Sequence, residues 1–143
     1  MVENACSSLW RWRAPLDYFA GMGPLLIAST AKTPEIKFDA DLGQLILSGR
    51  SIPENAVDFY RPVLEWAQAM DADTPLTVMV QLEYFNTSSS KCLLDLFKRL
   101  EVGHDVSVKW HFDADDEDML EAGEDYDHIV SLPFTFIEVD PGV

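Results

Sequence analysis

Every second side chain is apolar over residues 76–84, and this period of two predicts the clearest β-strand of the chain. The same alternation predicts strands over residues 35–38 and 106–112, and an apolar segment near the C-terminus predicts another over 134–139. Together these segments supply most of an expected sheet.

Two shorter strands are expected near the N-terminal end of the sheet. Residues 25–27 are all apolar, and residues 44–47 follow the turn-forming sequence at 39–43. Because that turn separates two strand patterns, residues 35–47 are expected to form a hairpin.

A helix is predicted to begin at Ser51–Glu54, where serine followed three residues later by glutamate forms a capping box. Apolar residues then keep helical spacing to Met70. Pro62 interrupts this pattern, and a proline inside a helix removes a hydrogen bond at a cost of roughly 3 kcal/mol. A kink or a break is therefore expected near residues 58–62.

Two further helices are predicted between the later strands. Apolar residues at 93, 96, 97 and 100 have the spacing of an amphipathic helix that ends near Gly103. Residues 115–124 form a weaker pattern, whose carboxylates suit a helix N-terminus. Strands followed by alternating helices and strands predict the α/β class, with a single mixed sheet and helices packed on it.

Residues 1–23 differ from the remainder of the chain. They contain Trp10-Arg11-Trp12-Arg13 and further aromatic residues, but no sustained period of 2 or 3.6. We interpret residues 1–23 as an N-terminal extension that can be disordered. Residues 24–143 are expected to form one domain.

Composition narrows the classes of function. With 143 residues and 48% hydrophobic content, the chain can bury a core without disulfides or metals. Cys6 and Cys92 lie in no CxxC or Cys/His grouping, which fits a reducing compartment. The sequence shows no secretory signal, and no apolar run approaches the roughly 18 residues that cross a bilayer. A cytoplasmic location is expected.

The formal net charge of −15 argues against nucleic acid or an anionic membrane as a partner, because either requires a basic patch. Acidic residues crowd the stretch 113–127, and no lysine or arginine follows Lys109. A solvated acidic surface explains this stretch, and a docking surface for a basic protein is the alternative.

Residues 86–90 form a cluster of hydroxyls, Asn-Thr-Ser-Ser-Ser, between a predicted strand and a predicted helix. Asn86 or Thr87 is expected at the N-cap, because such side chains satisfy free helix amides. One cap explains one residue, not four consecutive hydroxyls. The helix N-terminus also favours an anion, so phosphorylation is the second interpretation, with Lys91 nearby.

A metal site is conceivable at His111, Asp113 and Asp115, which would share one side if the strand continued. The calcium-binding EF-hand spacing is absent, and a strand end followed by an acidic helix explains the same residues. His104 and His128 are isolated, and the sequence contains neither a P-loop nor a Gly-x-Ser-x-Gly motif. No enzyme, metal or cofactor is therefore expected.

Several motifs occur in a specific order along the chain. They cover residues 33–39, 49–55, 59–62, 82–91, and 110–113 with 115–119. Together they resemble the SiaC family of bacterial regulatory phosphoproteins, over about residues 25–139. The resemblance implies a fold like that of the STAS-type anti-sigma-factor antagonists, and partner switching without catalysis.

The resemblance also implies partners and a modification site. A serine/threonine kinase would phosphorylate Thr87, with Ser88 as the fallback, and a PP2C-type phosphatase would remove the phosphate. The unphosphorylated form would bind and activate a diguanylate cyclase, a GGDEF protein, and so raise cyclic-di-GMP and promote biofilm formation. The residues expected on the partner surface are Asn86, Ser88, Ser89, Lys91 and Arg50.

Two alternatives stay open beside this hypothesis. One is a binding module whose acidic C-terminal surface docks a basic partner without control by phosphate. The other, less favoured, is a metal-dependent hydrolase built around His111, Asp113 and Asp115.

Overall fold

A computed structural model of the protein describes residues 25–71, 73–103 and 105–140. The expected extension, residues 1–23, lies outside the described residues. The elements follow in the order β1 (Leu26–Ile27), β2 (Glu35–Asp39), β3 (Gln44–Ser51), α2 (Ala56–Ala69), β4 (Leu76–Phe85), α3 (Thr87–Leu100), β5 (Val106–Asp113), α4 (Glu117–Ile129) and β6 (Phe134–Val139).

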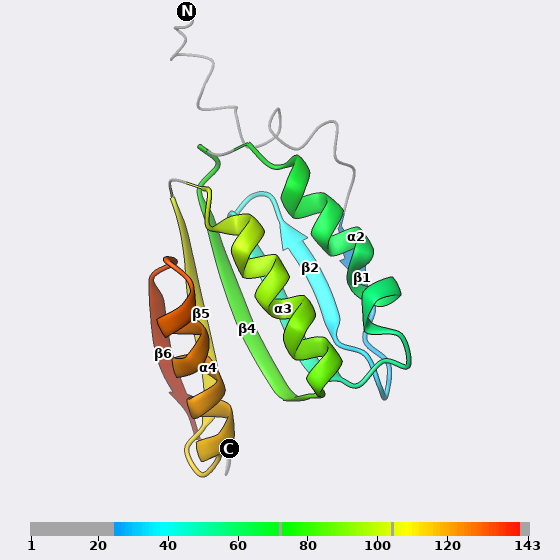
Figure 1. Ribbon diagram of the computed structural model, residues 1–143, viewed down its shortest axis with the longest axis vertical. Helices are drawn as coiled ribbons and strands as arrows, with labels where there is room; N and C mark the ends of the chain where they lie inside the picture. The colour runs from blue at the N-terminus through cyan, green and yellow to red at the C-terminus, as the bar shows by residue number, and fades with distance from the viewer. Residues whose placement is uncertain (1–24, 72, 104, 141–143) are drawn as a thin grey trace, which may run out of the picture.

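The six strands form one mixed sheet in the order β1-β2-β3-β4-β5-β6. Strands β1, β2 and β3 pair antiparallel, whereas β3 to β6 pair parallel. Each of the three helices connects two neighbouring parallel strands, and right-handed connections in this order place all three on one face. Figure 1 shows α2, α3 and α4 together in front of the sheet. The predicted α/β class with a mixed sheet is confirmed.

The core lies between that face and the helices. Alternate residues of the central strands point into it and are fully buried, among them Leu45, Leu47, Val78, Val80, Val108 and Trp110. Leu93, Leu96 and Phe97 of α3 meet them from the helix layer. The alternating apolar residues of the strands therefore form the sheet side of this core. The apolar residues at i, i+3 and i+4 of α3 form the helix side.

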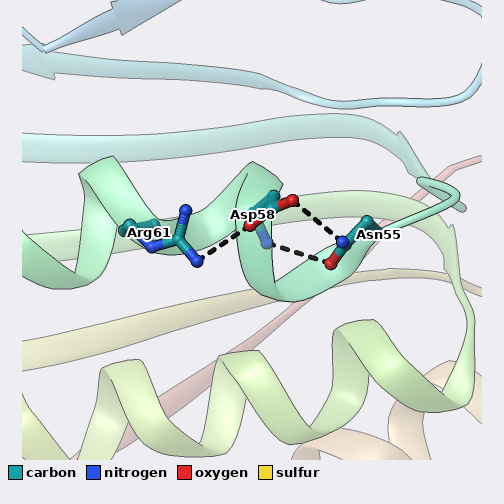
Figure 2. A network of polar contacts seen from close by, with 3 residues as sticks. All are labelled: Asn55, Asp58 and Arg61. Atoms are coloured by element: carbon teal, nitrogen blue, oxygen red, sulfur yellow. Dashed lines mark hydrogen bonds and ion pairs between the residues drawn. The ribbon is translucent and has the colours of Figure 1, made fainter.

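The helix after β3 does not begin where the capping box predicted. Ser51 is the last residue of β3 and is buried, so its hydroxyl cannot reach the helix amides. Asn55 is the N-cap instead: its Oδ1 accepts a hydrogen bond of 3.2 Å from the Asp58 amide. Figure 2 shows this cap, in which Asp58 also accepts from Asn55 Nδ2 at 2.9 Å and pairs with Arg61 at 2.8 Å.

α2 continues through Pro62, so of the two alternatives, a kink or a break, the break is wrong. Pro62 itself lies on the exposed side of the helix. Buried residues on both sides of the proline, Tyr60 before it and Val63 and Trp66 after it, hold the two halves against the same core. This packing offsets the free-energy cost of the hydrogen bond that the proline cannot donate.

α4 begins at Glu117 and extends to Ile129, whereas the sequence predicted residues 115–124. Asp116 is its N-cap and accepts a 3.0 Å hydrogen bond from the Met119 amide. The helix continues past residue 124 because Tyr126 is buried, with its ring 5.6 Å from that of Trp110. Among the described residues, no helix is long and apolar enough to cross a membrane.

Candidate functional site

The hydroxyl cluster lies at the C-terminal edge of the sheet, where α2 and α3 both begin. Ser51 and Phe85 are paired neighbours at the ends of β3 and β4, and the Asn86 amide donates a 3.0 Å hydrogen bond to the Ser51 carbonyl. This bond fixes the chain at the point where it leaves β4 and enters α3.

Asn86 is the N-cap of α3, one of the two expected positions. Its side-chain oxygen accepts from the Ser89 amide at 2.9 Å, and its carbonyl accepts from the Ser90 amide at 2.9 Å. The amides of Thr87 and Ser88 have no hydrogen-bond partner among the described residues. The exposed first turn therefore presents two free N–H groups at the positive end of the helix dipole.

Ser89 belongs to a buried chain of hydroxyls. Its hydroxyl donates to the Ser51 carbonyl at 3.1 Å and accepts from the Ser51 hydroxyl at 2.8 Å. Because the Ser51 proton is used in this way, the Tyr60 hydroxyl is the donor in its 2.6 Å contact with Ser51. Ser89, expected on the partner surface, instead joins α3 to β3 and α2 in the interior.

Ser90 is held on the other side of the helix by α4. The Tyr126 hydroxyl donates to the Ser90 carbonyl at 2.8 Å, so in the 3.0 Å contact between the two hydroxyls Ser90 is the donor. Ser90 is half-buried. Its contacts with Tyr126 therefore hold the first turn of α3 against α4.

Thr87 and Ser88 are the two exposed hydroxyls of the cluster. Lys91, one helical turn after Thr87, is exposed as well. The surplus of hydroxyls thus has two explanations: Ser89 and Ser90 fix the helix in place, and Thr87 and Ser88 face solvent.

Both tyrosines of these contacts stay protonated near neutral pH. Burial raises the pKa of Tyr60 from 10.0 to about 12, and the pKa of Tyr126 from 10.0 to about 12. Tyr126 is therefore a hydrogen-bond donor to Ser90 in the first turn of α3, and Tyr60 is a donor to Ser51 beneath that turn.

A groove of about 410 Å³ runs between α2 and α3 from the exposed hydroxyls. Its lining residues are Val57, Leu64, Thr87, Ser88, Lys91, Cys92 and Asp95. The Val57 side chain is 61% exposed, which is unusual for a valine on a packed helix. Burial raises the pKa of Cys92, so this thiol contributes apolar surface and not a nucleophile.

Arg50, also expected on the partner surface, is exposed near the end of β3. The pairing of β3 with β4 shifts between Gly49 and Arg50, at a glycine with φ of 114°. The guanidinium lies 5.9 Å from the centre of the Tyr84 ring, which is 51% exposed. Arg50 and Tyr84 therefore form a cationic and aromatic pair at the same edge as Thr87.

The candidate metal residues are not brought together. β5 ends at Asp113, and a turn closed by the 3.0 Å bond from the Asp116 amide to the Asp113 carbonyl carries Asp115 away. His111 Nδ1 donates to the Val80 carbonyl at 3.2 Å. Within residues 25–71, 73–103 and 105–140, no group of three or more His, Cys, Asp or Glu side chains is placed to hold a metal ion.

Comparison with known proteins identifies relatives of this chain. A sequence model described as the SiaC family regulatory phosphoprotein matches residues 27–139. An uncharacterized protein of Pseudomonas aeruginosa (strain UCBPP-PA14) is 36% identical over an alignment of 119 residues, and the alignment covers 79% of this chain and 94% of that protein. The regulatory class of the matched family confirms the expectation that this protein is not an enzyme.

Two solved structures of SiaC from Pseudomonas aeruginosa superpose on the chain. In one, SiaC is the activator in a complex with the diguanylate cyclase SiaD; it is 34% identical, with a TM-score of 0.73, over 80% of this chain and 99% of that one. Apo-SiaC is 33% identical, with a TM-score of 0.71, over 80% of this chain and 98% of that one.

Proposed function

Because the chain belongs to the SiaC family of regulatory phosphoproteins, we propose that it is a partner-switching protein that binds and activates a diguanylate cyclase. The solved complex of the related SiaC with SiaD supports this partner. Activation would raise cyclic-di-GMP and promote biofilm formation. The protein would act in the cytoplasm as a regulatory domain of residues 24–143.

Thr87 is the proposed phosphoacceptor, with Ser88 as the fallback. The observation that supports these two positions over the others is the division of the hydroxyl cluster: Ser89 and Ser90 are hydrogen-bonded to Ser51 and Tyr126, whereas Thr87 and Ser88 face solvent. The order of Thr87 before Ser88 is what the family resemblance implies. A kinase needs an exposed hydroxyl, so only the first two positions of the helix meet that requirement. A serine/threonine kinase would add the phosphate, and a PP2C-type phosphatase would remove it.

The same position suits a reversible switch. A phosphate adds about −1.5 to −2 charges at neutral pH. The free amides of Thr87 and Ser88, together with Lys91, would donate hydrogen bonds to the phosphate and stabilise its charge, and the domain would not need to refold. A partner seated in the groove would have to desolvate the dianion, which opposes binding.

The partner surface would comprise the first turn of α3 and the groove beside it. Asn86, Ser88 and Lys91 lie in or next to this turn, and Arg50 lies at the neighbouring strand end. Val57 supplies exposed apolar surface on the α2 side of the groove. Unphosphorylated Thr87 at the rim would allow the partner to contact all of these elements.

The test compares Thr87→Ala with Ser88→Ala. With the cognate kinase, Ser88→Ala is expected to take up one phosphate and Thr87→Ala none, as measured by intact mass. Thr87→Ala should still bind the cyclase and stimulate cyclic-di-GMP synthesis in the presence of kinase and ATP, whereas Thr87→Glu should lose binding.

Two results would contradict parts of the proposal. Phosphate uptake by Thr87→Ala at another residue would refute the site. Cyclase binding that is insensitive to Thr87→Glu, but lost when the carboxylates of residues 115–118 are neutralised, would favour the unregulated acidic module.

A further inference from the structure

We propose that residues 9–19 of the N-terminal extension dock on the sheet face opposite the helices, here called the open face. This inference does not depend on the proposed phosphorylation. It rests on a row of side chains across the sheet, on an acidic hollow beside that row, and on the chemistry and reach of the extension.

The open face is left bare by every described element. All three helices lie on the other side of the sheet, as Figure 1 shows. Strand pairing aligns one residue from each of five strands across the open face: Lys37, Ile46, Met79, Lys109 and Thr135. Ile46 and Met79 are direct neighbours at the centre of this row, and both are half-buried.

The row suits aromatic side chains. The thioether of Met79 and the apolar surface of Ile46 offer a contact for flat rings. Lys37 and Lys109 lie on either side of that pair, and an ammonium group attracts the face of an indole ring by about 0.5–1 kcal/mol at exposed sites. Both lysines are exposed in a chain with only 10 basic residues.

A hollow of about 390 Å³ adjoins the row toward the C-terminal ends of β4 and β5. Ser48, Gln81 and His111 line it on the side of the open face, and Leu82, Phe112 and Met119 line it on the side of the helices. The exposed carboxylates of Glu83 and Asp113 lie at its margin. An occupant with aromatic rings and positive charge would therefore match the row and the hollow together.

Residues 9–19 have this composition. They contain Trp10 and Trp12, each followed by an arginine, and then Tyr18 and Phe19. The family match begins only at residue 27, so the extension is an addition to the shared domain. Its two arginines complement Glu83 and Asp113.

The extension also reaches the open face from where it joins the sheet. It precedes Leu25, directly before the edge strand β1. Residues 20–24 join the segment to Leu25, and six extended Cα–Cα steps span at most about 22 Å. The Ile46–Met79 pair lies two to three strands from β1, which is about 10–14 Å at a spacing of about 4.8 Å. Docking there would leave the groove between α2 and α3 free for a partner.

The test uses the full chain and acrylamide quenching of tryptophan fluorescence. Trp66 and Trp110 are buried, so subtracting the signal of a Trp10→Phe/Trp12→Phe variant isolates the two tryptophans of the extension. We expect these two to be quenched several-fold less than free N-acetyltryptophanamide. Met79→Glu should abolish that protection. Val102→Glu adds the same charge at a site that is 72% exposed and outside the open face, and should not.

Lys109→Gln provides a second variant that keeps the apolar pair and removes the ammonium group without adding a negative charge, and it should weaken the protection. Quenching of the wild-type extension as fast as the free compound would overturn the proposal. So would protection that Met79→Glu and Lys109→Gln both leave unchanged. Protection that vanishes on dilution, together with a dimer mass in light scattering, would also overturn it, because a second copy would then supply the segment.

Discussion

The hydroxyl of Ser51 donates a hydrogen bond of 2.8 Å to the hydroxyl of Ser89, and this contact joins the end of β3 to the first turn of α3. Both side chains are fully buried, and Tyr60 of α2 extends the chain of hydroxyls. The turn that exposes Thr87 is therefore fixed from beneath by groups that the sequence separates by 38 positions.

Ser89→Ala should destabilise the protein. The change removes the acceptor of the Ser51 hydroxyl proton and one of the two donors to the Ser51 carbonyl, which keeps the Asn86 amide. A buried hydroxyl without its acceptor costs about 1–3 kcal/mol. We expect a loss of that size in the free energy of unfolding, measured by urea titration. Ser88→Ala, on the exposed side of the same turn, should stay within about 0.5 kcal/mol. Equal losses in both variants would contradict the buried network.

Asn86→Ala should remove the N-cap of α3. The Ser89 amide then loses its acceptor, and such a change typically costs about 1 kcal/mol of stability. Asn86→Asp is the matched control, because aspartate caps equally well and its charge is favourable at a helix N-terminus. Urea titration of both variants checks the pair, and a loss of equal size with aspartate would argue against capping.

Tyr60 should make stability depend on pH in the alkaline range. Its pKa is about 12 in the folded protein and near 10.0 when unfolded, so the unfolded chain loses the proton first as pH rises. The contribution is fully present below pH 10 and is lost toward pH 12, with a slope of up to about 1.4 kcal/mol per pH unit.

Tyr60→Phe tests this dependence. The variant should be less stable at pH 7, because Ser51 loses a hydrogen-bond donor, yet its stability should fall less steeply between pH 10 and 12. Tyr84→Phe, at an exposed tyrosine, serves as the control and should keep the wild-type slope. An unchanged slope in Tyr60→Phe would refute the assignment.

Gly123→Ala should destabilise the protein although alanine favours helix. A Cβ at this position would lie 2.6 Å from Trp110 Cδ1 and 2.8 Å from Phe136 Cε1, in a packed region. Overpacking of this kind costs about 1–3 kcal/mol, more than the gain of about 1 kcal/mol in helix propensity. Thermal unfolding compared with Glu124→Ala, an exposed neighbour, checks it, and a rise in Tm for Gly123→Ala would contradict it.

The spacing of apolar residues identified the strands and helices, because an element that buries one face repeats its apolar residues with the period of a strand or of a helix. The alternation of residues 76–84 lies within β4, and the apolar spacing of residues 93–100 lies within α3. Boundaries were less predictable. Ser51–Glu54 satisfied the capping pattern, yet the pairing of β3 with β4 draws Ser51 into the sheet and moves the cap to Asn55.

The hydroxyl cluster at 86–90 was visible in the sequence, as was the excess of its hydroxyls over what one cap requires. The roles of its members were not. Helix geometry and the neighbouring elements decide that Ser89 meets Ser51 and Ser90 meets Tyr126, while Thr87 and Ser88 stay exposed. Tyr126 lies 36 positions from Ser90, and no local pattern encodes such a contact.

The sequence by itself determined the class of fold, a helix start at Asn86 or Thr87 and the family resemblance, because each depends on nearby residues or ordered motifs. Only the tertiary structure decided which hydroxyls are exposed, that α2 and α3 form a groove, and that His111, Asp113 and Asp115 do not converge. These properties depend on which distant segments pack together, and the order of the strands sets that packing.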